Sequence, residues 1–346
     1  MAVWPCLLEA EPIKIAVFHA PLSRDGPGLL YRDIQKDDRQ VLAVAAVIAH
    51  TEPDVIALTD FDYDADGLAV AAFQAKLFEV GHPLPYAFAP QPNSGRPSGL
   101  DIDQDGRMAE PEDAIGYGRF WGDGGVVVLS RWPIDPERSF ADTTTFWSDV
   151  PGATLPEISH AEDLAKLPVS TSVHMGAWID APNVPFFLLS GASTAPVFDG
   201  PEDLNGYRNA AELALWRSKI TELTAPFVLA FNANLDPADG EGHRDELRDF
   251  LADPLIIATE PRSVGGVGEA DPTHIGDAAL DTVDWKGPTP GNLRVSYVLP
   301  SVGWKVAATG VFWPDLGDPN RKLLGEDGLA AGSHRLVWAE LELSKN

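Results

Sequence analysis

Six apolar, β-type runs in this chain each stop at a small or polar residue, where a sheet would deliver side chains into a cleft. The polar residues at these strand ends are His19, Asp60, Asn232, Asn234, Ser296 and His334. Histidine and carboxylate side chains are zinc ligands, so His19, Asp60 and His334 together could hold one divalent cation. The alternative is that they are ordinary polar strand ends, satisfied inside the protein.

A second chemical pattern lies in residues 101–112, which have the spacing of a calcium loop. Alternate carboxylates can wrap one cation, a glycine permits the sharp turn, and the last glutamate can close the loop. These residues are Asp101, Asp103, Asp105, Gly106 and Glu112, and the carbonyl of Arg107 would add a ligand. Pro111 argues against a standard exiting helix, and an acidic solvated loop is the alternative. We expect a structural Ca²⁺ site.

A similar run starts at Asp62 and continues through Asp64 and Asp66 to Gly67, but Phe73 occupies the position of the closing glutamate. It is therefore interpreted as an acidic turn before a helix.

The 346-residue chain has the composition of a globular protein with a strong negative charge. Its 45% hydrophobic residues can bury a sizeable core, and its 30 Pro and 31 Gly favour short strands joined by structured loops. The formal net charge of −27 repels polyanions, which argues against nucleic-acid binding and makes divalent cations natural companions. The single cysteine, Cys6, excludes an internal disulfide.

The sequence leaves the compartment and the oligomeric state open. No apolar run reaches the length of a transmembrane helix, so no membrane span is expected. Residues 1–10 are too short for a complete signal peptide and lack a basic start. They could be the remainder of a trimmed leader, in which case the protein would be secreted or periplasmic.

Strands and helices alternate early in the chain, and β-hairpins dominate later. We predict strands at 13–18, 55–58, 125–130, 173–179, 186–190, 227–231, 296–299, 304–312 and 335–342. Helices are predicted near 35–50, 68–78, 209–223 and 243–251, with a short one near 161–167. Two mixed sheets packed face to face with outer helices, an α/β sandwich, fit this order. We expect an extension at 1–12 and one domain at 13–346, with the calcium loop inserted at 101–112.

Together these strand ends resemble the endonuclease/exonuclease/phosphatase superfamily, which are metal-dependent phosphoesterases with an α/β sandwich fold. The resemblance runs from about Ile13 to Leu343 and is closest to a bacterial branch. It is carried by residues 53–58, 116–120, 128–134, 196–203, 280–286, 291–295 and 325–330.

The positions that are catalytic in the superfamily are mostly substituted in this chain. Where the resemblance implies Asn, a metal-binding Glu and His, this chain has His19, Asp60 and Gly191. Its Asp-x-Asn pair becomes Asn232 and Asn234, its Asp before Tyr-Val-Leu-Pro becomes Ser296, and its Asp-His pair becomes Ser333 and His334. An amide cannot act as a general base, and a serine cannot stabilise a protonated histidine as a carboxylate would.

The resemblance also implies that Tyr117 and Arg119 face substrate phosphate. Arg208 could shape the cleft, and His174 lies in a strand near its expected mouth. An exposed arginine paired with nearby acids and a plain cross-strand histidine are the alternatives. Asn209 is interpreted as the N-cap of the helix it precedes.

The leading hypothesis is a degenerate phosphoesterase homologue, inactive or very weakly active, that binds a small phosphorylated ligand or a protein in the old cleft. The loss of carboxylates argues against Mg²⁺ or Mn²⁺ there. The alternative is an active divalent-metal-dependent phosphodiesterase, phosphatase or nuclease with a rearranged site, in which Asp62 or Asp236 replaces a missing group. A third class, an interaction module that uses its acidic surface, also stays open.

Overall fold

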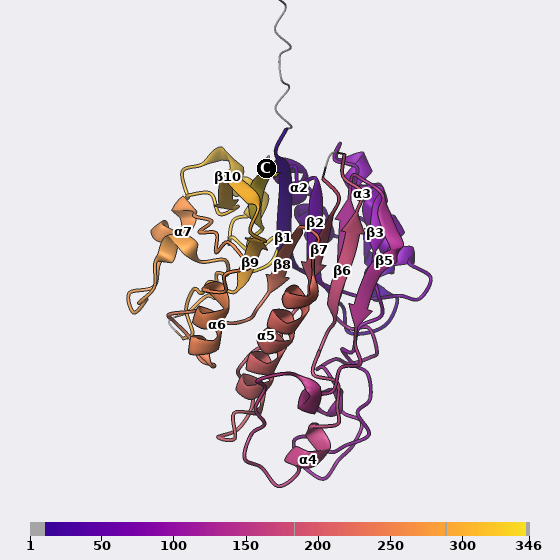
Figure 1. Cartoon of the computed structure of the whole chain (residues 1–346). Coiled ribbons are helices and arrows are strands. Elements are labelled where there is room, and N and C mark those ends of the chain that lie inside the picture. The colour runs from indigo at the N-terminus through magenta and orange to yellow at the C-terminus, as the bar shows by residue number, and fades with distance from the viewer. Residues whose placement is uncertain (1–10, 183, 288, 344–346) are drawn as a thin grey trace, which may run out of the picture.

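The computed structural model describes residues 11–182, 184–287 and 289–343, so Cys6 and the possible leader remainder lie outside it. Within these residues, two mixed β-sheets pack face to face and helices lie outside them (Figure 1). This confirms the predicted two-sheet sandwich. No helix in these residues is long and apolar enough to cross a bilayer.

The first sheet has the order β10-β11-β1-β2-β4-β3. Its strands are β10 (Trp304–Val311), β11 (Val337–Leu343), β1 (Ile13–Leu22), β2 (Val55–Phe61), β4 (Gly125–Ser130) and β3 (Tyr86–Phe88). Because β1 and β2 run in parallel and are covered on both faces, their sequences are nearly continuous apolar runs. The outer helices on this side are α1 (Leu29–Gln35), α2 (Arg39–Thr51) and α3 (Leu68–Glu79).

The second sheet has the order β5-β6-β7-β8-β9. Its strands are β5 (Ile134–Asp142), β6 (His174–Ile179), β7 (Phe186–Ser190), β8 (Phe227–Asn232) and β9 (Ser296–Pro300). Along β8, Val228 and Ala230 enter the core between the sheets, whereas Leu229 and Phe231 pack in a second cluster with Trp216. This alternation places α5 (Leu204–Glu222) and α6 (Arg244–Leu251) outside the second sheet and directs Asn232 into the space between the sheets.

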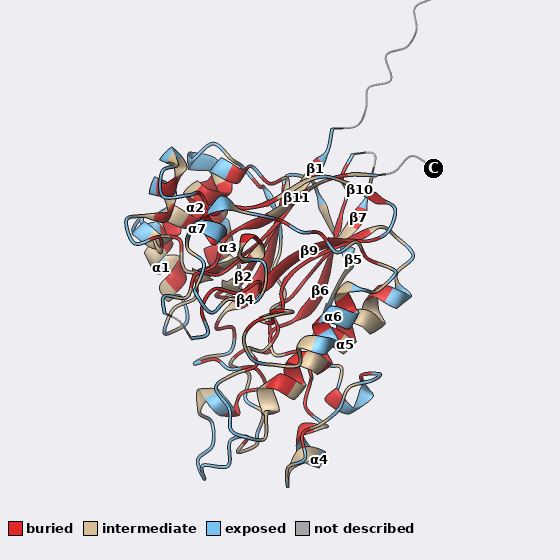
Figure 2. Cartoon of the chain, turned by 90° about the vertical axis from the view of Figure 1, so that its left-hand side faces the viewer, coloured by how far each residue is buried: buried red, intermediate tan, exposed pale blue. Residues whose placement is uncertain are grey.

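The remaining helices are short. They are α4 (Ala161–Leu164), α7 (Val264–Gly268) and the 3₁₀ turns η1 (Pro111–Asp113), η2 (Trp147–Asp149), η3 (Ala278–Leu280) and η4 (Pro319–Leu324). Figure 2 shows that burial is concentrated in the strands, while the loops at the lower end of the view and the outer faces of the helices alternate between exposed and buried residues.

The structure adds elements to those predicted and moves some boundaries. The edge strands β3 and β5 are additional, because β3 is short and exposed and β5 is polar and contains Pro136, as edge strands tolerate. Residues 29–35 form α1, separate from α2. The predicted N-cap role of Asn209 is wrong, because α5 starts at Leu204 after Asp203 and Asn209 is buried within the helix.

Candidate functional site

Residues of the three strands β1, β2 and β8 and the residues before β11 meet between the two sheets. They form the strand-end cluster, defined by His19, Thr59, Asn232, Asn234 and His334. His19 Nδ1 lies 2.9 Å from Thr59 Oγ1 and 3.1 Å from Asn232 Nδ2. Asn232 Nδ2 also donates to Asn234 Oδ1 at 2.9 Å. Because an amide nitrogen only donates, His19 Nδ1 must accept, and the imidazole is neutral. Burial lowers the pKa of His19 to about 4, in agreement with this assignment.

His334 packs against His19, with 4.2 Å between the ring centroids. Trp285 also contacts His334 edge-on, at 5.8 Å between centroids. His334 is buried, and burial together with His19 and Arg335 holds its pKa well below the usual range. Its Nδ1 has no hydrogen-bond partner in the described part of the chain. Both imidazoles of the cluster are therefore neutral.

Asn234 is positioned by the loop after β7 and by α5. Its backbone is left-handed, with φ 50°, and its Nδ2 donates to Ser193 O at 2.6 Å. Asn209 on α5 joins the two loops, because its Nδ2 donates to Thr194 O at 2.7 Å and to Ala233 O at 2.8 Å. Asn209 is thus a positioning residue for Asn234, a role that no local sequence signal indicated.

Asp60 lies near the end of β2 in a left-handed conformation, with φ 64°, at a register shift in the pairing of β2 with β4. Burial, opposed by a hydrogen bond from Ser23 and reinforced by Asp123, raises the pKa of Asp60 to about 7. Burial, reinforced by Asp123, also raises the pKa of Asp62 to about 7, although its carboxylate accepts from Gly124 N and Arg24 N. Asp60, Asp62 and Asp123 form an acidic group beside the strand-end cluster.

The four predicted substrate-binding residues fall into two pairs. Tyr117 is exposed, and the half-exposed Arg119 has Asp25 at 3.4 Å and Asp123 at 3.8 Å. Arg208 is buried and donates to the carbonyls of Pro168 and Val169. The structure therefore leaves Tyr117 and Arg119 accessible and engages Arg208 inside the protein.

His174 is also buried, with Nδ1 2.7 Å from Ser170 Oγ and Nε2 3.0 Å from Glu212 O. Burial lowers its pKa to about 4. Because both ring nitrogens are hydrogen-bonded inside the protein, the structure does not bring His174 to a surface where it could contact a ligand.

The loop at 101–112 gathers three of its carboxylates. Oxygens of Asp101, Asp103 and Asp105 lie within 4.8 Å of one another, and Asp101 Oδ1 has no hydrogen-bond partner among the described residues. Glu112 is exposed on η1 and is not part of this trio. Instead Asp113 is buried and accepts from Ile102 N at 2.8 Å and Glu110 N at 3.3 Å. The Arg107 side chain ion-pairs with Glu110, at 3.3 Å.

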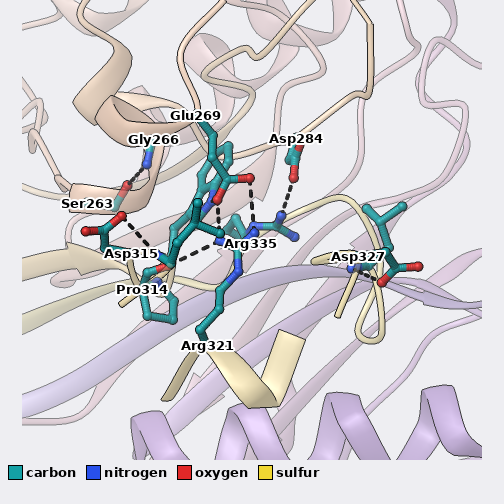
Figure 3. A network of polar contacts seen from close by, with 12 residues as sticks. Ser263, Gly266, Glu269, Asp284, Pro314, Asp315, Arg321, Asp327 and Arg335 are labelled. Carbon is teal, nitrogen blue, oxygen red and sulfur yellow. Dashed lines mark hydrogen bonds and ion pairs between the residues drawn. The ribbon is translucent and has the colours of Figure 1, made fainter. Parts of the chain in front are cut away.

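A charged network that includes Arg335, the residue after His334, joins Glu269, Asp284, Arg321 and Arg335 (Figure 3). Lys286 belongs to it through ion pairs with Asp284 and Glu269. Arg335 Nη2 and Lys286 Nζ reach Asp284 Oδ2 at 2.8 Å and 2.7 Å, and Arg321 pairs with Glu269 through both its Nη atoms. The Asp284 amide also donates to Ser333 O at 2.9 Å. The network therefore fixes the chain on both sides of His334.

Two surface cavities lie away from the strand-end cluster. One of about 420 Å³ is lined by residues 242–246 and Arg248. Another of about 440 Å³ lies between the end of α2 and the loop after β10, lined among others by His50, Phe312 and Trp338.

Comparison with known proteins places this arrangement in a family. A model of the Endonuclease/Exonuclease/phosphatase family matches residues 25–333. The chain belongs to this family. This confirms the resemblance predicted from the strand ends. A search of curated proteins finds no match.

Solved structures agree on the fold. An endonuclease/exonuclease/phosphatase from Beutenbergia cavernae DSM 12333 has a TM-score of 0.57 and 17% identity, covering 97% of this chain and 72% of that one. An endonuclease/exonuclease/phosphatase family protein from Leptotrichia buccalis C-1013-b has a TM-score of 0.53 and 14% identity, covering 96% of this chain and 100% of that one. Sphingomyelinase C from Streptomyces griseocarneus has a TM-score of 0.51 and 16% identity, covering 96% of this chain and 99% of that one. At these identities the similarity concerns the fold alone.

The family typically uses divalent metals, so the donor atoms of the strand-end cluster can be tested against that requirement. Asn232 Nδ2 and Oδ1 are both engaged with neighbours in the cluster, and Ser296 Oγ is a buried hydroxyl. The rings of His19 and His334 pack against each other at a tilt of 50°, and neither asparagine nor serine carries charge. This donor set does not fit a tightly held divalent cation, for which buried carboxylates are the usual ligands.

Proposed function

We propose that this family member hydrolyses phosphoesters very weakly or not at all, and that its strand-end cluster serves binding. The observation that supports this is the chain of neutral contacts from Thr59 through His19 and Asn232 to Asn234. Hydrolysis needs a base that activates water and a charge that stabilises the phosphoryl oxygens. The cluster supplies neither, because both histidines have lowered pKa values and the remaining groups are amides and hydroxyls.

The ligand we propose for the cluster is a small phosphorylated molecule or a protein segment. A neutral cluster offers hydrogen bonds without paying the desolvation cost of a buried ion. Tyr117, which is exposed, and Arg119, which is half-exposed, remain accessible for contact with such a ligand.

The test is hydrolysis of bis(p-nitrophenyl) phosphate and p-nitrophenyl phosphate with Mg²⁺, Mn²⁺ or Ca²⁺. Wild type, His334→Ala and Asn234→Ala are compared after circular dichroism has shown that each is folded. We expect the three to give the same rate, equal to that of the metal alone. Metal-dependent turnover that disappears in both variants contradicts the proposal.

A second candidate is a working hydrolase whose cation sits in the acidic group of Asp60, Asp62 and Asp123. The observation that favours it is the raised pKa of Asp60 and Asp62, which burial causes and Asp123 reinforces, because a bound cation would stabilise the charged carboxylates. This candidate predicts Mn²⁺-dependent turnover that Asp60→Asn and Asp123→Asn abolish and that His334→Ala leaves in place.

We also propose that the loop at 101–112 binds Ca²⁺ in a structural role. The trio of carboxylates, the free Asp101 Oδ1 and the left-handed Gly106, with φ 89°, support this. The Asp113 carboxylate accepts from the Ile102 and Glu110 amides and Glu112 lies outside the trio. We therefore expect the three carboxylates of the trio and water molecules to be the ligands.

A further inference from the structure

An imidazole is buried between two carboxylates in a part of the molecule that the proposed function does not use. His274 Nε2 lies 3.6 Å from Asp239 Oδ2 and 3.6 Å from Asp281 Oδ1. The exposed fractions of the three side chains are 7%, 10% and 1%. Asp239 belongs to the turn after Asn234, and Asp281 precedes Val283, which bridges to His334. The group therefore joins the two loops that lead to the strand-end cluster.

The spacing of these atoms is not that of hydrogen bonds. An N–H···O bond spans about 2.7–3.2 Å, and one Nε2 proton cannot serve two carboxylates. Within the described residues, His274 Nε2 and Asp281 Oδ2 have no hydrogen-bond partner. Two ligand atoms of one tetrahedral zinc ion, each 2.0–2.2 Å from it, lie roughly 3.3–3.5 Å apart, close to each of the two imidazole–carboxylate distances. Asp239 Oδ2 and Asp281 Oδ1 lie more than 4.8 Å from each other, so these two carboxylates would have to approach on binding.

The charges around the group are unbalanced. No lysine or arginine in the described part of the chain pairs with Asp239 or Asp281. The carboxylates of Asp236, Asp271 and Asp277 add further negative charge around the group. Arg262 pairs with Asp277, while Arg294 donates to Thr259 O and faces Tyr297. Buried charges in proteins are normally paired or coordinate a metal.

Asp239 is also held in place for such a role. Its Oδ1 accepts from Ile275 N at 2.9 Å and its Oδ2 from Gly276 N at 2.7 Å, so the residues after His274 fix the carboxylate. Each oxygen keeps a second lone pair for another partner. Asp236 differs, because its two oxygens already accept from Ala238, Asp239 and Arg294 amides.

We propose that His274, Asp239 and Asp281 bind a divalent transition-metal cation of the Zn²⁺ class. One imidazole with two carboxylates is a nitrogen and oxygen donor set of the kind that zinc accepts, whereas Ca²⁺ and Mg²⁺ prefer oxygen alone. Each carboxylate lies close to the His274 ring but not close to the other carboxylate. Binding of the ion would therefore draw both carboxylates toward it. The ion would clamp the turn after β8 to the segment that carries Val283 and Trp285.

The test uses Co²⁺, which occupies zinc sites and absorbs visible light when four-coordinate. Full-length protein is stripped of metal with a chelator and titrated with Co²⁺ while absorption and heat are measured. We expect one saturable site with visible bands, displaced by Zn²⁺. His274→Ala and Asp281→Asn should lose these bands. His243→Gln, at a histidine that pairs with Asp203 at 2.8 Å, and Asp103→Asn in the calcium loop should keep them.

A second variant keeps the test decisive if His274→Ala does not fold. His274→Cys places a thiolate ligand at the same position, so bound Co²⁺ should gain a sulfur charge-transfer band in the near ultraviolet. Folded wild type that binds no Co²⁺ at neutral pH overturns the proposal. Bands that persist in His274→Ala and gain nothing in His274→Cys overturn it as well.

Discussion

His334 and Arg335 are adjacent in the chain but belong to opposite kinds of surroundings. His334 lies in the strand-end cluster, where each contact joins neutral groups, such as the imidazole pair at 4.2 Å. Arg335 lies in the charged network, where its guanidinium meets Asp284 at 2.8 Å and covers Trp313 at 4.6 Å from the ring centroid. Charged side chains can therefore be buried as deeply as His334 in this protein. Their absence from the strand-end cluster is a property of the residues at those strand ends and not of burial itself.

This contrast separates what holds the fold from what would do chemistry. The network stabilises the segment that leads into β11 through ion pairs, backbone contacts to Ser333 and Gly332, and aromatic packing. None of these contacts depends on the identity of Asn232 or Ser296. The strand ends can thus lose ionisable groups while the frame that presents them stays intact.

The largest effect is expected when the charged network is broken. Asp284→Ala leaves Arg335 buried without its partner, since the Arg335 side chain is 0% exposed. Removing one member of a buried pair typically costs about 3–5 kcal/mol in the free energy of unfolding. Guanidinium denaturation measures this loss. Arg131→Gln, at an exposed pair with Asp54, is the control and should change stability by no more than about 1 kcal/mol. Equal losses in both variants would show that the buried pair contributes no more to stability than the exposed one.

The second effect concerns the neutral histidines. The pKa of His174 and that of His19 are lowered to about 4, so between pH 6.5 and 4 the unfolded chain binds protons that the native state does not. Their contribution to stability is present above pH 6.5 and is lost as the pH falls. For the fully buried His174 the loss amounts to roughly 3 kcal/mol over this range.

The measurement is the difference in unfolding free energy between wild type and variant at pH 7, 6 and 5. Taking this difference removes the opposite slope of the buried acids Asp60 and Asp62, whose raised pKa values favour the native state at low pH. His174→Gln should flatten the acid loss most, and His19→Asn less, because His19 is partly exposed. Parallel profiles for wild type and His174→Gln would show that His174 becomes charged in the folded protein.

The fold could be predicted because its central strands appear in the sequence as apolar runs. Each residue of β4 is buried, as the run from Gly125 to Ser130 indicated. The polar edge strand β5 gave no such signal, since hydrogen bonding on one side suffices for an edge. The strand-end residues were found for the same reason, because a strand end fixes where its next side chain lies.

The contacts of the site could not be predicted in the same way. His19 and Asn232 are 213 residues apart, and their hydrogen bond depends on how the two sheets pack. Asn209, Asp113 and Asp123 act through loops whose paths no periodicity encodes. His274 lies in a turn-rich segment, and its position between Asp239 and Asp281 emerges only in three dimensions. The engagement of Arg208 and His174 inside the protein likewise follows from tertiary packing.

A smaller effect is expected when charge is put back into the strand-end cluster. Asn232→Asp removes the donor to His19 and sets a carboxylate against Asn234 Oδ1, which now lies 2.9 Å from Asn232 Nδ2. The loss of a buried donor typically costs about 1–3 kcal/mol at pH 7. It should shrink at pH 5, where the new acid takes up a proton. Thermal and denaturant unfolding at the two pH values check this.

Adding Mn²⁺ to the unfolding experiments on Asn232→Asp tests whether the new carboxylate can bind a cation. We expect it to leave the stability of Asn232→Asp unchanged, because Ser296 and Ser333 supply no further charge for a cation. A gain of more than about 1.4 kcal/mol, which corresponds to a tenfold shift in the unfolding equilibrium, would instead show that one carboxylate is enough to rebuild a metal site. The neutral cluster would then be one substitution away from the family's chemistry.

The smallest effect is expected at the calcium loop, most of whose residues are exposed. At free Ca²⁺ about five times the dissociation constant, one bound ion adds about 1 kcal/mol to the unfolding free energy, and a chelator should remove it. Asp103→Asn with Asp105→Asn should be insensitive to both. If chelation lowers stability equally in this double variant, the ion lies elsewhere, and loss of that effect in His274→Ala would assign it to the cluster of His274, Asp239 and Asp281.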